Sequence, residues 1–86
     1  VVKLVAYNSS GLEADGHTVI GPDTVNLMET HTYSYEPPVG QSNIVEEWQV
    51  VNCDILGNAN GQTVTIRFDN DTNEQTPYIA ARISGP

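Results

Sequence analysis

The fold is decided by the stretch from Thr32 to Ile83, TYSYEPPVGQSNIVEEWQVVNCDILGNANGQTVTIRFDNDTNEQTPYIAARI. Apolar and polar residues alternate in short runs, and turn-forming residues separate the runs, which is the pattern of half-buried strands. No run shows the apolar repeat and the caps of a helix. The expected strands are residues 32–35, 44–51, 53–56, 63–68 and 78–83. This spacing is typical of a β-sandwich.

The residues before this stretch predict additional strands. Residues 1–7 are apolar on both faces of an extended run, which indicates a strand that is covered on both sides. Residues 17–20 predict a second strand, and residues 24–28 predict a short edge strand. Asp15-Gly16 predicts a tight turn, and Asn60-Gly61 predicts a type I′ hairpin turn because both residues tolerate positive φ.

Together these elements predict an all-β protein with about seven strands in an antiparallel sandwich. We expect one domain over residues 1–86, in which residues 1–18 form an N-terminal strand and its loop and residues 19–86 form the main sandwich. The chain has no initiator methionine and no basic leader, so it is expected to be a mature product or an excised segment.

The charge of the chain excludes two classes of partner. Only Lys3, Arg67 and Arg82 are basic, against eleven acidic residues, and the formal net charge is -8. Nucleic acids and anionic lipids are bound mainly by neutralising phosphates with Lys and Arg, so neither is an expected partner. No apolar run approaches 18 residues, so no membrane insertion is expected.

The residues that could carry catalysis do not form a recognisable set, and we expect no enzyme. His17 and His31 have no partner at the spacing of a metal site or a catalytic triad. Glu46 and Glu47 are adjacent in a strand and therefore point to opposite faces. The single cysteine, Cys53, is expected to be a small core residue.

An oxygen-rich loop after the strand of residues 63–68 is the best metal candidate, through Asp69, Asp71 and Glu74. Compared with a twelve-residue calcium loop that begins at Asp69, it has Glu74 where the loop needs glycine and Ala80 where it needs a bidentate glutamate. We therefore expect no cofactor, with weak calcium binding as the alternative.

The aromatic residues and the sequons suggest two sites at the surface. The candidates for a glycan-stacking platform are Tyr33, Tyr35, Trp48 and Tyr78, of which Tyr33 and Tyr35 share one face of their strand. Trp48 occupies the strand position at which sandwiches bury an aromatic residue, so it is assigned to the core. Asn8 and Asn70 begin sequons for N-glycosylation.

Several short motifs carry a resemblance to a known family: Gly21-Pro22-Asp23-Thr24-Val25, Tyr33-Ser34-Tyr35, Glu47-Trp48-Gln49-Val50, Ile55-Leu56-Gly57 and the run from Gly61 to Phe68. Over about residues 19–84 the chain resembles the PKD-like, immunoglobulin-like domains of bacterial surface proteins, which occur in large Bacteroidetes adhesins and secreted proteins. The resemblance implies an immunoglobulin-like sandwich in an extracellular, cell-surface protein.

The chain departs from this family pattern at its end. The family expects one more strand after residues 78–83, whereas this chain reaches Gly85-Pro86 and carries extra strands before Gly21. We therefore predict that the N-terminal strand closes the sandwich, in its own chain or in a neighbouring chain. The residues expected to make this contact are Val1, Val2, Leu4, Val5 and Tyr7.

The expected function is that of a non-catalytic structural or adhesive module: a repeat, a spacer or a strand-exchanged filament subunit. The expected partners are neighbouring copies of the domain or other surface proteins. A weak similarity between residues 2–7 and 78–83 is consistent with a tandem repeat. The alternative function is that of a carbohydrate-binding module, with glycans as partners of Tyr33 and Tyr35.

Overall fold

The computed structural model describes residues 1–69 and 76–84, which form seven strands and, within these ranges, no helix. The prediction of an all-β protein with seven strands in two sheets is confirmed. In chain order the strands are β1 (Lys3–Tyr7), β2 (Thr18–Ile20), β3 (Glu29–Glu36), β4 (Val45–Val51), β5 (Asp54–Leu56), β6 (Thr63–Phe68) and β7 (Tyr78–Ile83).

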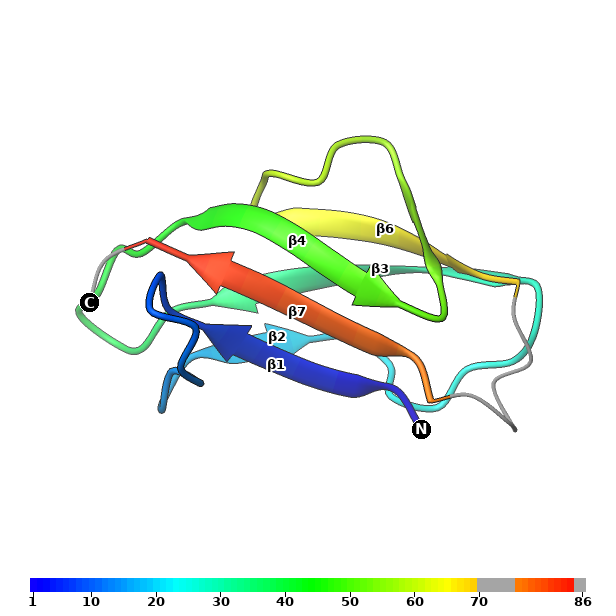
Figure 1. Cartoon of the computed structure of the whole chain (residues 1–86), viewed down its shortest axis with the longest axis horizontal. Coiled ribbons are helices and arrows are strands. Elements are labelled where there is room, and N and C mark those ends of the chain that lie inside the picture. The colour runs from blue at the N-terminus through cyan, green and yellow to red at the C-terminus, as the bar shows by residue number, and fades with distance from the viewer. Residues whose placement is uncertain (70–75, 85–86) are drawn as a thin grey trace.

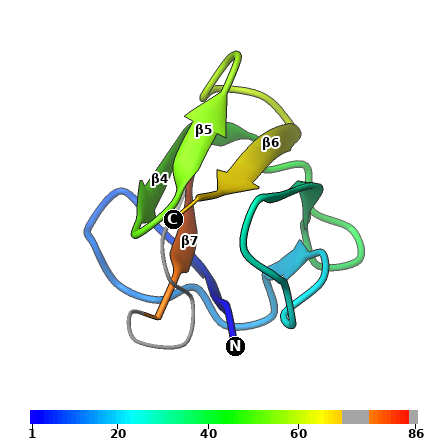
Figure 2. The ribbon, with the colours of Figure 1, turned by 90° about the vertical axis from the view of Figure 1, so that its right-hand side faces the viewer.

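The strands form two layers that pack face to face (Figure 1). One sheet has the order β1-β7-β4, and the other has the order β2-β3-β6-β5. Figure 2, turned by 90° about the vertical axis, shows β4 and β7 in one layer and β5 and β6 in the other. All described pairings are antiparallel except that of β1 with β7, which is parallel and corrects the prediction of an antiparallel sandwich at this one pairing.

The inward side chains of both layers build the core. Alternate residues of β3 and β6 point inward, as the period of a strand requires, and Tyr33, Ile66 and Phe68 have no exposed surface. From the opposite sheet, Trp48 fills the centre with only 1% of its surface exposed, which confirms its assignment to the core. Its indole Nε1 donates a hydrogen bond of 2.7 Å to the carbonyl oxygen of Gly61.

A β-bulge in β4 allows two side chains that are three positions apart to point into the core. Val45 and Trp48 are three positions apart, so a regular strand would place them on opposite faces. The pairing with β7 shifts between Val45 and Glu47, and Val45 pairs with Ile83 while Glu47 pairs with Arg82. The extra residue, Glu46, lets both Val45 and Trp48 reach the core.

β1 closes the edge of the three-stranded sheet. It pairs with β7 from Lys3–Tyr78 to Tyr7–Arg82. On its other edge the amide of Val2 donates to the carbonyl of Asp23 (2.7 Å), and the carbonyl of Ala6 accepts from the amide of Ala14 (2.9 Å). The strand is therefore held along β7 and at both ends of its outer edge.

Two local predictions are wrong and one is confirmed. Residues 24–28 contain a bend at Thr24 and a turn at Leu27 and Met28 instead of an edge strand, and Met28 has a positive φ of 71°. Asn60-Gly61 is not a type I′ turn, because the positive φ of the β5–β6 connection lies at Gly57 (84°). That connection instead packs on β4, where Ala59 accepts a hydrogen bond of 2.6 Å from the amide of Trp48. Asp15-Gly16 does form a turn, with a φ of 83° at Gly16.

Candidate binding groove

On the outer face of the sheet β1-β7-β4, the side chains of residues that are paired across the three strands form three rows. The first row is Lys3, Tyr78 and Val51; the second is Val5, Ala80 and Gln49; the third is Tyr7, Arg82 and Glu47. Ala80 stands in the middle of this array, with larger side chains on every side. A small residue surrounded by large ones leaves a depression in the face of the sheet.

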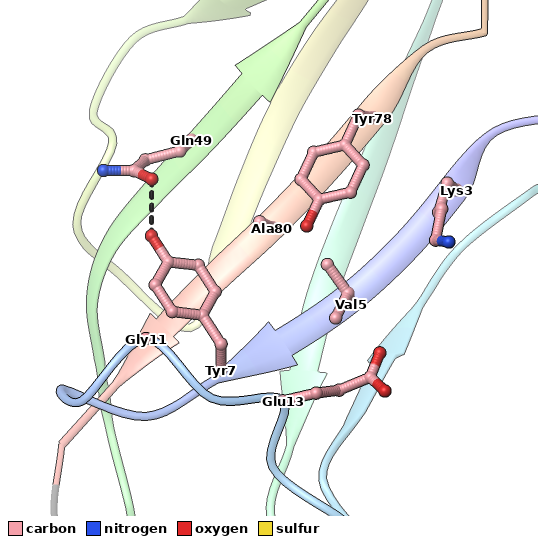
Figure 3. Close-up of a pocket in the computed structure, with 8 residues that line it drawn as sticks. All are labelled: Lys3, Val5, Tyr7, Gly11, Glu13, Gln49, Tyr78 and Ala80. Atoms are coloured by element: carbon pink, nitrogen blue, oxygen red, sulfur yellow. Dashed lines mark hydrogen bonds between the residues drawn. The ribbon is translucent and has the colours of Figure 1, made fainter.

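This depression has a volume of about 490 Å³, and we call it the tyrosine groove (Figure 3). Its floor consists of Ala80 and Val5, which are 1% and 9% exposed although they point away from the core. The residues that line the whole groove, including its walls and rim, are Lys3, Val5, Tyr7, Gly11, Glu13, Gln49, Tyr78 and Ala80.

Tyr7 and Tyr78 stand on either side of Ala80 and are both half-buried. In Figure 3 the hydroxyl of Tyr7 points toward β4 and the hydroxyl of Tyr78 points toward β1. The Tyr7 hydroxyl donates a hydrogen bond to Oε1 of Gln49, and Nε2 of Gln49 donates to Oε1 of Glu47 at 2.9 Å. Burial raises the pKa of Tyr7, which keeps its hydroxyl protonated as a donor. These bonds fix the orientation of the Tyr7 ring.

The loop after β1 supplies one rim of the groove through Gly11 and Glu13. Asn8 holds this loop, since its Oδ1 accepts hydrogen bonds from the amides of Ser10 (2.9 Å) and Leu12 (3.2 Å). Glu13 then pairs with Tyr7 in an isolated antiparallel bridge. Because the loop folds back on the strand that precedes it, the position of Glu13 depends on β1.

Charged groups lie at the groove and beside it. Lys3 and Glu13 bring one charge of each sign to the lining. Arg82 lies on the same face but interacts with acidic neighbours, at 3.5 Å from Glu46 and 3.7 Å from Glu47. The groove therefore offers both a cationic donor and an anionic acceptor.

The predicted residues of the N-terminal strand divide between the two faces of β1. Val2 and the half-buried Leu4 point into the core, and Val5 and Tyr7 belong to the tyrosine groove. Val1 precedes the strand and is 83% exposed. In this structure the strand pairs with its own chain, and pairing with a second chain stays a prediction.

The two tyrosines predicted to stack on a glycan do not lie at the surface. Tyr33 is 0% exposed and Tyr35 is 4% exposed, because both point between the sheets. The Tyr33 hydroxyl donates to the carbonyl of Pro22 (2.5 Å), and the Tyr35 hydroxyl lies 2.6 Å from Nδ1 of His17. Burial raises the pKa of Tyr33 to about 12. The predicted stacking site at Tyr33 and Tyr35 is therefore corrected: buried rings cannot stack on a ligand.

The metal and glycosylation candidates lie partly beyond the described residues. Asp71, Glu74 and Asn70 lie outside them, whereas Asp69 is exposed. A hydrogen bond with Asp69, together with its negative charge, raises the pKa of Asp54. The described residues contain no group of three His, Cys, Asp or Glu side chains that could hold a metal ion. Asn8, the other sequon residue, is half-buried in the loop after β1.

The remaining titratable candidates have structural partners. His17 stacks on Tyr35 with ring centroids 5.9 Å apart, and Nε2 of His31 lies 2.9 Å from Oε1 of Glu29. Cys53 is buried, and burial raises the pKa of its thiol to about 11. A thiol with this pKa is protonated at neutral pH and is a poor nucleophile.

Sequence reasoning missed Gln49 and Ala80 as members of a site, and it grouped Tyr78 with rings that the structure buries. These three residues lie on β7 and β4, and only the register of the sheet brings them beside β1. The sequence did contain one signal. Tyr78 and Ala80 are two positions apart, so they share a face of their strand, and a small alanine next to a large ring leaves a hollow.

Comparisons of the chain with family models, with curated proteins and with solved structures found no match. The resemblance to PKD-like domains therefore stays a prediction. Within the described residues, no helix is both long and apolar enough to span a membrane.

Proposed function

We propose that this chain is a non-catalytic, immunoglobulin-like module of an extracellular bacterial surface protein or filament. In the proposal β1 is the closing strand, and it either closes its own domain or exchanges with a neighbouring copy. The observation that carries the proposal is the parallel pairing of β1 with β7 at the edge of the three-stranded sheet.

The strand order supports the immunoglobulin-like assignment. Constant-type immunoglobulin sandwiches have strands A, B, E and D in one sheet and C, F and G in the other. The order β2-β3-β6-β5 corresponds to A-B-E-D, and β4 and β7 correspond to C and F. β1 then occupies the place of G, but it runs parallel to β7, whereas G runs antiparallel to F.

The packing of β1 supports its role as a closing strand. Val2 and Ala6 are 4% and 3% exposed, and both belong to the core cluster with Leu4 packed against it. Removing β1 would uncover this part of the core and the hydrogen-bonding edge of β7. An uncovered edge with apolar neighbours binds another strand readily, which is the basis of strand exchange.

The extracellular and bacterial parts of the proposal rest on the family resemblance. The sandwich fold is supported by the packing of the interior, where Trp48, Tyr33 and Phe68 fill the space between the sheets. Functional contacts would then be made by a surface or by an exchanged strand.

A disulfide trap tests the proposal. Lys3 and Tyr78 are paired across β1 and β7 on the outer face, and paired residues of neighbouring strands lie within the range of a disulfide. We expect Lys3→Cys/Tyr78→Cys to oxidise to a covalent monomer at low concentration, and to disulfide-linked multimers when refolded at high concentration. The single variant Lys3→Cys is the control, and the buried Cys53 can stay in place.

Deletion of residues 1–7 completes the test. We expect the truncated chain to unfold or aggregate, and an added peptide of residues 1–7 to restore a folded complex. A truncated chain that remains a soluble monomer with an unchanged melting curve would contradict the closing-strand role.

A further inference from the structure

We infer that the tyrosine groove is a binding site for a neutral saccharide. The inference concerns the outer face of the sheet and does not depend on the proposed exchange of β1. It replaces the corrected stacking site, Tyr33 and Tyr35, with a different pair of rings, Tyr7 and Tyr78, on the opposite sheet.

The size of the groove is that of a small-molecule site. Its volume of about 490 Å³ lies within the range of roughly 300–1,000 Å³ that is usual for ligand pockets. The floor formed by Ala80 and Val5 has almost no exposed surface, so a ligand would rest mainly on the two tyrosine rings and the rim.

The two rings are placed for stacking. Figure 3 looks onto the outer face of the sheet, and the rings of Tyr7 and Tyr78 are seen face-on above the strands. The face of an aromatic ring carries partial negative charge and attracts the weakly positive hydrogens of C–H groups. One face of a pyranose ring is lined with such C–H groups, so it matches this surface.

The polar groups of the lining match hydroxyls. Lys3 donates hydrogen bonds and the carboxylate of Glu13 accepts them, while each sugar hydroxyl can do both. Both groups are exposed and would stay hydrated beside a purely apolar ligand, whereas a ligand with hydroxyls can bond to them directly.

The same charges argue against an anionic ligand. Glu13 lies in the lining beside Lys3, and the chain carries a net charge of -8. An anion would therefore be repelled by the protein as a whole and, because Glu13 offsets Lys3, would gain no net attraction at the site. A neutral saccharide has no such penalty.

The groove is assembled from distant parts of the chain. Lys3, Val5 and Tyr7 come from β1, and Tyr78 and Ala80 come from β7. A bound saccharide would contact both strands at once, so binding should also stabilise the docking of β1.

The experiment titrates the whole chain, labelled with ¹⁵N, with cellohexaose, xylohexaose, mannohexaose and, as an anionic probe, oligogalacturonate. We expect at least one neutral oligosaccharide to bind saturably and to shift the amide resonances of Lys3, Tyr7 and Ala80. Tyr78→Ala should weaken binding by about tenfold, the loss expected for one aromatic contact. Ala80→Leu should abolish binding, because the larger side chain fills the hollow.

Two variants separate the groove from general effects on the fold. Val51→Ala removes an exposed side chain of the same face that does not line the groove and should leave the affinity unchanged. Tyr7→Phe keeps the ring but loses the bond to Gln49, so it should retain more affinity than Tyr7→Ala.

Three outcomes would overturn the inference. These are no binding of any neutral probe, binding that persists in both Tyr78→Ala and Ala80→Leu, and binding of oligogalacturonate alone that is lost in Lys3→Gln. None of them bears on the disulfide trap, so the two proposals fail independently.

Discussion

Gly21 lies directly against the ring of Tyr33, and a Cβ built on Gly21 would stand 2.2 Å from Cδ2 of that ring. The backbone of Gly21 does not have positive φ, so the glycine is required by space and not by conformation. The next residue, Pro22, accepts the hydrogen bond of the Tyr33 hydroxyl. The segment between β2 and β3 therefore contacts the Tyr33 side chain twice: Gly21 packs against the ring, and Pro22 binds the hydroxyl.

Gly21→Ala is expected to destabilise the domain strongly, by about 1–3 kcal/mol, because the added methyl group forces the Tyr33 ring or the backbone to move. Urea denaturation followed by circular dichroism gives the free energy of unfolding. Gly40→Ala is not a matched control because Gly40 has a φ of 85°, so the exposed Asn58→Ala serves instead. An unchanged midpoint in Gly21→Ala would mean that the contact with Tyr33 is not tight.

Trp48→Ala is expected to cost about 3–5 kcal/mol, since it deletes a fully buried aromatic side chain. That loss is a large part of the roughly 5–15 kcal/mol by which domains are stable. Trp48→Phe should cost less, because it retains a ring but leaves the carbonyl of Gly61 without its donor. The midpoints of denaturant unfolding rank the variants, and the exposed Val51→Ala is the control. If Trp48→Phe and Trp48→Ala lose the same free energy of unfolding, the hydrogen bond outweighs the packing of the ring.

Glu29 should stabilise the fold above its unfolded pKa and lose this effect in acid. The backbone amide of Asn26 donates to the Glu29 carboxylate at 3.0 Å, and this bond, followed by those of His31 and the Asn26 side chain, lowers the pKa of Glu29 from 4.5 to about 2. A lowered pKa contributes stability that is present above pH 4.5 and disappears as the pH falls toward 2.

Glu29→Gln should therefore lower the Tm at pH 7 and leave it nearly unchanged near pH 2. The measurement is a series of melting curves across this range, with the exposed Glu36→Gln of the same strand as the control for loss of one charge. A Tm difference that is constant with pH would assign the effect to something other than ionisation of Glu29.

Asp54 should have the opposite pH dependence. The hydrogen bond and the negative charge of Asp69 raise the pKa of Asp54, so this pair favours the fold when Asp54 is protonated and opposes it as the pH rises through the raised pKa. Asp54→Asn is expected to raise the Tm at pH 7, and the gain should shrink as the pH falls. The control is Asp15→Asn, which removes one negative charge in the exposed turn before β2. An equal rise in Tm in that variant would show that the effect comes from the net charge and not from the contact with Asp69.

Much of the fold could be predicted from local sequence. The alternation in residues 63–68 corresponds to β6, because a strand buried on one face carries an apolar side chain at every second position. The apolar run of residues 78–83 corresponds to β7, whose residues are largely buried on both faces. Local turn chemistry was less reliable. Asn60-Gly61 suits a type I′ turn, but in the structure the loop covers the edge of β4 at Ala59 and Gly61 accepts the Trp48 hydrogen bond.

The all-β fold and the burial of Trp48 could be predicted from local sequence, because alternation and the position of an aromatic residue within a strand are local properties. The burial of Tyr33 and Tyr35, and the place of Tyr7 and Tyr78 beside a groove, follow from how the two sheets pack. Alternation tells which side chains of a strand share a face, but which of the two faces meets the other sheet, and which strand lies beside it, depends on the packing of the whole chain.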